Sequence, residues 1–125
     1  MPTGLKDGAL HPCPRSPNCV SSQSPAGTSH HIEPMRFTGD PKIALKRLKS
    51  IVLIMPDTAL VSETERYLHV TYTTRFLRFV DDVEFLFEDD GTLHVRSASQ
   101  TGYSDLGVNR RRVEQIRSLW TSQVL

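Results

Sequence analysis

The chain has 125 residues, of which 38% are hydrophobic and 23% charged, as expected for a soluble globular protein with one domain and one core. Its formal net charge of +1 creates no general attraction for nucleic acid, so we expect no nucleic-acid partner. The longest apolar run, residues 51–55, is far shorter than the roughly 18 residues of a membrane span, and residues 1–30 contain no signal-peptide-like apolar stretch. We therefore expect neither a transmembrane segment nor a signal peptide in this chain.

The first 31 residues differ in composition from the remainder. Seven of the eight prolines lie in residues 1–41, and the first aromatic residue of the chain is Phe37. A segment with so few large apolar residues cannot form a core of its own. We expect residues 1–31 to be an extended arm, docked or loose, and residues 32–125 to be a single domain.

Two cysteines lie in this arm, and their pairing is open from the sequence. Cys13 and Cys19 could form a disulfide that closes a short loop, or remain as thiols. With His11, His30 and His31 they supply zinc-ligand types, but the spacing matches no standard zinc finger. We expect a disulfide or thiols, and neither a metal nor another cofactor.

The folded part is predicted to begin with a strand over residues 32–37 and a helix after it. Asp40 is a suitable N-cap, with Pro41 at the first helical position. Apolar residues then recur at helical spacing until Pro56 ends the helix. The predicted buried stripe consists of Ala44, Leu48, Ile51, Val52 and Met55.

Four strands are predicted next, and apolar and polar residues alternate in the last three of them. They cover residues 58–62, 66–74, 78–88 and 92–99. His69 and His94 fall on the polar faces of the second and fourth of these strands, and we expect both to be solvated.

The last two strands form a hairpin whose register can be predicted. A three-residue loop over residues 89–91 places Phe87 opposite Leu93, so the apolar residues of both strands share one face. A two-residue turn would separate these apolar faces. The longer loop also places Gly91 at the left-handed position that such a loop requires.

This register has two consequences. On the outer face Glu84 lies opposite Arg96, as a cross-strand ion pair that would be worth well under about 1 kcal/mol if exposed. On the inner face Asp81 lies opposite Ser99, close to Ser97, so one end of the core face becomes polar.

A final helix is predicted over residues 106–122, with Ser104 or Asp105 as its N-cap. The complete order is β-α-β4-α. This order predicts an α+β fold, in which an antiparallel sheet of about five strands carries two helices on one face. The predicted buried stripe of the last helix consists of Val113, Ile116, Leu119 and Trp120.

Three segments resemble motifs of one family. They are CPRSPNCVSSQ at residues 13–23, DDVEF at 81–85, and RSAS followed by GYSDLGVNR within 96–110. On these motifs nearly the whole chain is similar to the family called domain of unknown function 1499 (DUF1499). The resemblance implies no established activity, cofactor or catalytic residue, and this chain has Gln100 where the family usually has arginine. Family members often carry export or membrane-anchoring leaders or are plastid proteins, so the resemblance favours an exported or organellar location.

The polar end of the hairpin continues into the loop before the last helix, and this region carries the candidate site. Carboxylates, hydroxyls and an arginine could orient a small polar ligand, or could satisfy one another as a structural network. The candidate ligand-binding residues are Asp81, Ser97, Ser99, Tyr103, Asp105, Asn109 and Arg110.

Three consecutive arginines, Arg110 to Arg112, stand near the start of the last helix, where the helix dipole disfavours cations. They could bind an anionic ligand. Alternatively, they could balance the six acidic side chains of residues 81–90, and we favour this charge balance.

No recognised catalytic or nucleotide-binding motif occurs, so no catalytic residue is assigned and enzymatic activity is not favoured. The sequence favours a binding or accessory domain that recognises a small anionic ligand or a protein partner through residues 97–110. One alternative is a small hydrolase- or isomerase-like enzyme using Asp81 with Tyr103 or Asp105. A second is a structural or assembly module.

Overall fold

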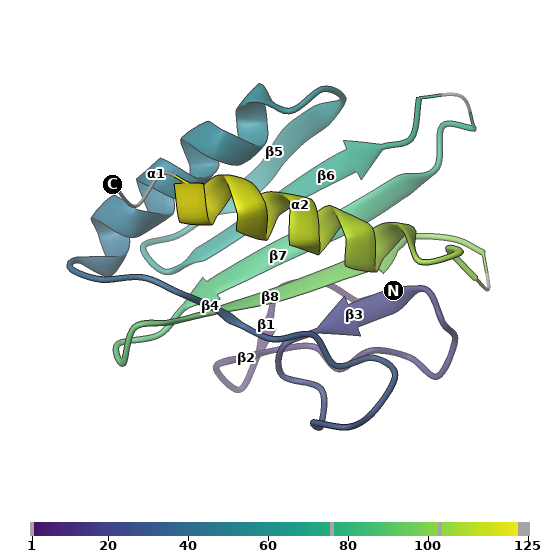
Figure 1. Ribbon diagram of the computed structural model, residues 1–125, viewed down its shortest axis with the longest axis horizontal. Coiled ribbons are helices and arrows are strands. Elements are labelled where there is room, and N and C mark those ends of the chain that lie inside the picture. The colour runs from purple at the N-terminus through teal and green to yellow at the C-terminus, as the bar shows by residue number, and fades with distance from the viewer. Residues whose placement is uncertain (1, 76, 103, 123–125) are drawn as a thin grey trace.

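The computed structural model describes residues 2–75, 77–102 and 104–122. They form an antiparallel sheet of six strands, two helices on one face of it, and a separate two-stranded hairpin near the N-terminus (Figure 1). The α+β class and the two helices on one face are confirmed. The expected strand number of about five was too low, because the N-terminal segment contributes one strand to the sheet.

The helices are α1 (Pro41–Ile54) and α2 (Val108–Ser122). The strands of the main sheet are β3 (Cys19–Ser21), β4 (Met35–Arg36), β5 (Thr58–Glu63), β6 (Tyr67–Thr73), β7 (Val80–Phe87) and β8 (Thr92–Ser99). The separate hairpin is formed by β1 (Leu5–Lys6) and β2 (Ala9–Leu10). The order in the main sheet is β3-β8-β7-β6-β5, and β4 also pairs with β8.

Helix α1 begins as the sequence predicts. The Asp40 carboxylate accepts a hydrogen bond from the Lys42 backbone N–H at 2.9 Å, and Pro41 occupies the first turn. Its buried residues are Ala44, Leu45, Leu48 and Val52, with Ile51 and Met55 partly buried. The predicted stripe is therefore confirmed, with Leu45 as an additional member.

The predicted register of the β7–β8 hairpin is confirmed. Phe87 pairs with Leu93, and Asp81 pairs with Ser99. Gly91 has a φ of 88°, and a Cβ at this position would lie 3.0 Å from the Phe37 carbonyl oxygen. The turn therefore requires glycine both for its conformation and for the close approach of the chain before α1.

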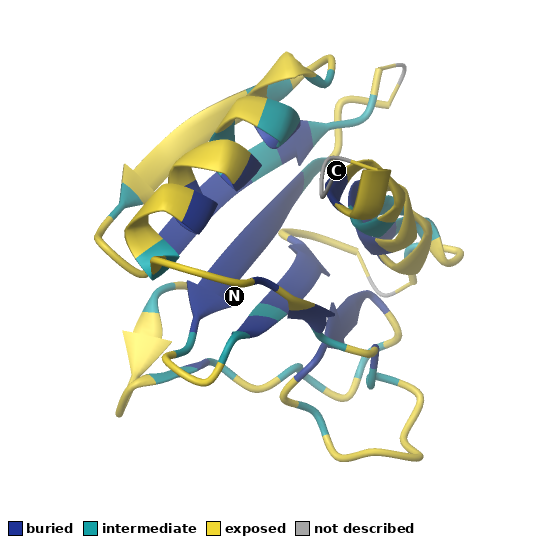
Figure 2. Ribbon diagram, turned by 60° about the vertical axis from the view of Figure 1, so that its left-hand side comes forward, coloured by how far each residue is buried: buried dark blue, intermediate teal, exposed yellow. Residues whose placement is uncertain are grey.

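The core lies between the sheet and the two helices. Figure 2 shows the buried residues on the central strands and on the helix sides that face them, whereas β5 is largely exposed. Val113, Ile116 and Trp120 of α2 are buried as predicted, but Leu119 is 37% exposed. Leu119 therefore lies at the rim of the helix face rather than within the stripe.

The N-terminal segment is not confirmed as an arm outside the sheet. Its strand β3 pairs with β8, with Val20 opposite Ser97. Farther towards the N-terminus, Leu10 packs against Tyr67 and Leu86 on the sheet face opposite the helices. Strand β3 has only three residues, so its alternation is too short to be recognised from sequence.

Candidate functional site

Four of the predicted site residues form one hydrogen-bonded cluster at the start of α2. Asn109 is fully buried, and its side-chain oxygen accepts from the Ser97 hydroxyl at 2.6 Å. Its side-chain nitrogen donates to the Ser99 hydroxyl at 3.0 Å and to the Asp105 carboxylate at 2.8 Å. A buried amide is costly unless paired, and this one uses both its donor and its acceptor groups within the fold.

Asp105 acts as the cap of α2. Its carboxylate accepts from the backbone N–H of Gly107 at 2.7 Å and of Asn109 at 3.2 Å. A carboxylate at this position also interacts favourably with the helix dipole. Asp105 therefore takes one of the two predicted capping roles, and both of its oxygens are occupied. The helix begins at Val108 and not at residue 106 as predicted, because Leu106 and Gly107 have positive φ angles of 54° and 81°.

Asp81 is paired with Arg112, which was not among the predicted site residues. The two side chains lie 2.6 Å apart, and Asp81 is 3% exposed. Arg112 also donates to the Asn109 side-chain oxygen at 3.2 Å and lies 4.8 Å from the Tyr72 ring centroid. Residues three apart share a helix face, so the position of Arg112 relative to Asn109 was the signal for this contact.

The other two arginines of the triplet point elsewhere. The Arg110 guanidinium donates to the carbonyl oxygens of Ser29 at 2.8 Å and His31 at 2.9 Å. Arg111 donates to the Leu106 carbonyl oxygen at 3.0 Å. Among the described residues, no carboxylate lies within ion-pair distance of either guanidinium. The expected balance with the acidic residues 81–90 therefore holds for Arg112 alone.

The loop before α2 borders two hollows. One, of about 230 Å³, lies between this loop and the N-terminal segment and is lined by Ser29, His30, Ser104, Asp105 and Arg110 among others. We call it the loop pocket. The other, of about 120 Å³, is lined by residues that include Asp81 and Ser99. The predicted residue Tyr103 lies outside the described residues.

On the opposite sheet face, the predicted cross-strand ion pair of Glu84 and Arg96 is confirmed, and it is buried. Arg96 and Glu84 lie 3.1 Å apart, and both side chains are fully buried. The Tyr67 hydroxyl and the Gly4 backbone N–H also donate to the Glu84 carboxylate. Burial and the hydrogen bond to Glu84 raise the pKa of Tyr67 above its ordinary value, so Tyr67 stays a proton donor.

A second polar pair lies on the same face. His69 is buried, not solvated, and its Nε2 lies 2.8 Å from the Asp82 carboxylate. Gln100 donates to both Asp82 oxygens at 3.2 and 3.3 Å. Burial opposes ionisation of Asp82, but the hydrogen bonds from His69 and Gln100 outweigh it and lower its pKa. Among the described residues, no hydroxyl or thiol contacts His69, so the pair has no nucleophile.

His94 was also expected to be solvated, but it is half-buried. Its Nδ1 lies 2.9 Å from the Ser22 hydroxyl. Burial lowers the pKa of His94, which keeps the ring neutral near neutral pH.

The cysteine and histidine group of the N-terminal segment is resolved as a disulfide between Cys13 and Cys19. The ring nitrogens of His30 and His31 face the carbonyl oxygens of Cys19 and Ser24. Within the described ranges, no three His, Cys, Asp or Glu side chains gather where they could hold a metal ion. Nor is any helix of these ranges both long and apolar enough for a membrane span.

Comparison with known proteins identifies one family. The family model described as Protein of unknown function (DUF1499) matches residues 9–119. No curated protein and no solved structure matches the chain. Because this match covers most of the chain, and includes the loop pocket, the buried Asn109 cluster and the disulfide, the chain belongs to the DUF1499 family.

Proposed function

We propose that the protein is a binding domain that recognises a small anion in the loop pocket. The observation that carries the proposal is the state of Arg110, which lines this pocket. Backbone carbonyl oxygens orient its guanidinium group, and no carboxylate of the described residues neutralises it. A guanidinium has five N–H donors, and Arg110 uses only one nitrogen for the carbonyl contacts. The remaining donors suit a phosphate, sulfate or carboxylate group.

The lining of the loop pocket is compatible with an anion. Ser29, His30 and Ser104 add hydroxyl and imidazole groups beside Arg110. Asp105 also lines the pocket, but its two oxygens already accept hydrogen bonds from α2. A volume of about 230 Å³ favours a ligand of the size of phosphate or a short carboxylate.

The hydrolase- or isomerase-like alternative has less support. Of its proposed acid and base, Asp105 uses both carboxylate oxygens at the start of α2, and one oxygen of Asp81 is engaged by Arg112. A catalytic carboxylate needs to reach substrate with a free oxygen. These contacts support a binding role over a catalytic one.

The assembly alternative is supported by one separate observation. Strand β5 lies at an edge of the sheet, and its Leu60 and Val61 are 44% and 53% exposed. An unpaired edge with exposed apolar residues can pair with a second copy. Sedimentation analysis would show a dimer that Val61→Lys dissociates; a monomer at all concentrations would exclude this alternative.

We also propose that the protein works in an oxidising compartment, in agreement with the leaders found in its family. The support is the disulfide between Cys13 and Cys19, since such bonds persist mainly outside the reducing cytosol. Thiol labelling of protein isolated from its native cells should find no free thiol. Complete labelling of both cysteines would contradict this location.

Titration with inorganic phosphate tests the anion-binding proposal. At about ten times the Kd, phosphate should stabilise the protein by about 1.4 kcal/mol, measured by thermal unfolding. The double variant Arg110→Ala/Arg111→Ala should lose this stabilisation. Arg66→Ala removes a positive charge far from the pocket and should keep it. Equal responses of the double variant and the wild type would refute the proposal.

A further inference from the structure

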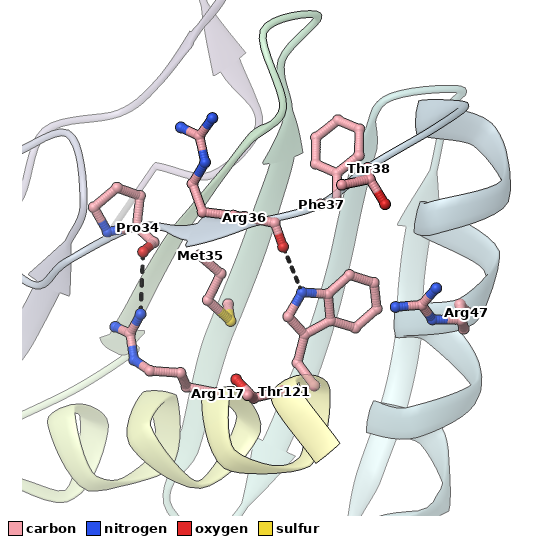
Figure 3. A pocket seen from close by; sticks show the side chains of 9 residues that line it. Pro34, Met35, Arg36, Phe37, Thr38, Arg47, Arg117 and Thr121 are labelled. Carbon is pink, nitrogen blue, oxygen red and sulfur yellow. Dashed lines mark hydrogen bonds between the residues drawn. The ribbon is translucent and has the colours of Figure 1, made fainter. Parts of the chain in front are cut away.

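A larger hollow lies beside the C-terminal half of α2, away from the loop pocket. It has a volume of about 660 Å³ and is bounded by β4 with its flanking residues, by α1, and by α2 (Figure 3). We call it the arginine–tryptophan groove. Its volume is in the range of sites that bind small organic molecules, roughly 300–1,000 Å³.

The wall of this groove is apolar and held in place. Met35, Phe37 and Trp120 line it, and the Trp120 indole N–H donates to the Arg36 carbonyl oxygen at 2.8 Å. Because the only polar atom of the indole is satisfied, the ring keeps a fixed orientation. Met35, Phe37 and Trp120 are only 3%, 8% and 2% exposed, so the wall presents apolar edges to a ligand rather than open ring faces.

The charge of the groove has a single sign. Its lining includes Arg36, Arg47 and Arg117 and contains no aspartate or glutamate. Such a lining attracts an anion, and it disfavours a cation. The three arginines differ, however, in what they already contact.

Two of these arginines are engaged by the fold. Arg117 pairs with Glu114 at 2.8 Å and donates to the Pro34 carbonyl oxygen at 3.1 Å, as Figure 3 shows for the second contact. Arg36 donates to the Thr92 hydroxyl at 3.1 Å, which directs it towards the β7–β8 hairpin.

Arg47 is the exception. Figure 3 shows it extending from α1 towards the groove, and its guanidinium carbon lies 4.3 Å from the Trp120 ring centroid. No carboxylate of the described residues pairs with it, so its contact with the indole leaves its charge unneutralised. The groove thus combines one free cationic group with an apolar wall.

We propose that the arginine–tryptophan groove binds an amphipathic carboxylate. The carboxylate group contacts Arg47, and the apolar body lies along Met35, Phe37 and Trp120. The single guanidinium directed at the groove matches a head group with one negative charge and two oxygens. This site and its ligand class are separate from the loop pocket and its small anion.

Fluorescence titration with octanoate tests this proposal, because Trp120 is the only tryptophan of the chain. Octanoate, added below its micelle-forming concentration, should change the emission with saturation. Arg47→Met keeps an unbranched apolar side chain but removes the guanidinium and its charge, and should raise the apparent Kd at least about tenfold. Arg47→Lys retains the charge without the planar guanidinium and should bind with intermediate affinity.

Matched controls separate this site from a purely structural contact. Lys46→Met removes a neighbouring exposed charge of α1, on the side of Glu63, and should bind octanoate as the wild type does. Octan-1-ol lacks the charge and acetate lacks the apolar body, so neither should produce the same saturable change. The Arg110→Ala/Arg111→Ala variant should retain octanoate binding, even if it loses phosphate binding.

Three results would overturn the proposal. The first is the absence of saturable binding to wild type. The second is equal affinity of wild type and Arg47→Met for octanoate, which would leave Arg47 as a contact between α1 and α2 only. The third is binding of octan-1-ol as tightly as octanoate, which would show that the charge of Arg47 does not contribute to the affinity for the carboxylate group.

Discussion

The two ends of α2 use polar residues in opposite ways. At its start, the side chain of Asn109 is hydrogen-bonded to those of Asp105 and Arg112. Arg112 also donates a hydrogen bond to one carboxylate oxygen of Asp81 on the sheet. At its other end, Arg47 lies over Trp120 without a carboxylate among the described residues. The dense group of polar residues around Asn109 is thus a structural network, whereas an arginine without a carboxylate partner among the described residues, Arg110 beside this network or Arg47 at the other end, marks a candidate for ligand binding.

This contrast predicts that substitutions in the hydrogen-bonded cluster around Asn109 act mainly on stability. Asn109→Ala leaves the buried hydroxyls of Ser97 and Ser99 without a shared partner, and should cost roughly 3 kcal/mol in the free energy of unfolding. Urea denaturation measures this loss. Gln115→Ala, at an exposed position of the same helix, should stay within about 0.5 kcal/mol of wild type. A comparable effect of both substitutions would show that the cluster does not stabilise the fold.

The ion pair between Asp81 and Arg112 should show the next largest effect. A double-mutant cycle with Asp81→Asn and Arg112→Met should give a coupling energy of about 2 kcal/mol, since both side chains are nearly buried. The exposed pair of Arg66 and Asp89 is the matched control and should couple by less than about 1 kcal/mol. Equal coupling in the two cycles would place Asp81 in solvent and make it available to a ligand.

The hairpin shows what the sequence could predict. Its register follows from the alternation that ends in Phe87 and resumes at Leu93, because burial of one face permits one register only. The network at the start of α2 was partly predictable, since residues of adjacent elements meet there. Arg112 was missed because the three consecutive arginines look equivalent until the helix direction is known.

Other features that the sequence did not predict come from contacts between distant parts of the chain. The Glu84–Arg96 pair is buried because Gly4 and Pro12 contact it, about 80 residues away in the chain. Likewise, the groove forms where Arg47 of α1 meets Trp120 of α2. The apolar stripe of each helix predicts which of its residues are buried. It does not predict which of its other residues contact the neighbouring helix.

On the other sheet face, the buried carboxylate of Asp82, paired with His69, should also contribute to stability. Its pKa is lowered in the folded protein, so its contribution to stability is fully present above the ordinary aspartate pKa and is lost as pH falls through the lowered value. Asp82→Asn should therefore flatten the acid side of the stability profile, measured by urea denaturation at acidic pH. Asp89→Asn changes an exposed carboxylate and should leave the profile nearly unchanged. If Asp82→Asn loses stability at acidic pH as the wild type does, the hydrogen bonds of Asp82 do not favour its ionised form.

Substitution of Arg47 should have the smallest effect on stability and the largest effect on octanoate binding. Arg47→Met removes a cation–π contact of an exposed side chain, and this should cost less than about 1 kcal/mol in the free energy of unfolding. The same substitution should weaken octanoate binding at least about tenfold, whereas Asn109→Ala should weaken it little once unfolding is accounted for. Parallel urea denaturation and fluorescence titration of both variants measure the two quantities. If Arg47→Met instead destabilises the fold as strongly as Asn109→Ala and leaves octanoate binding intact, both ends of α2 are structural and the contrast between them disappears.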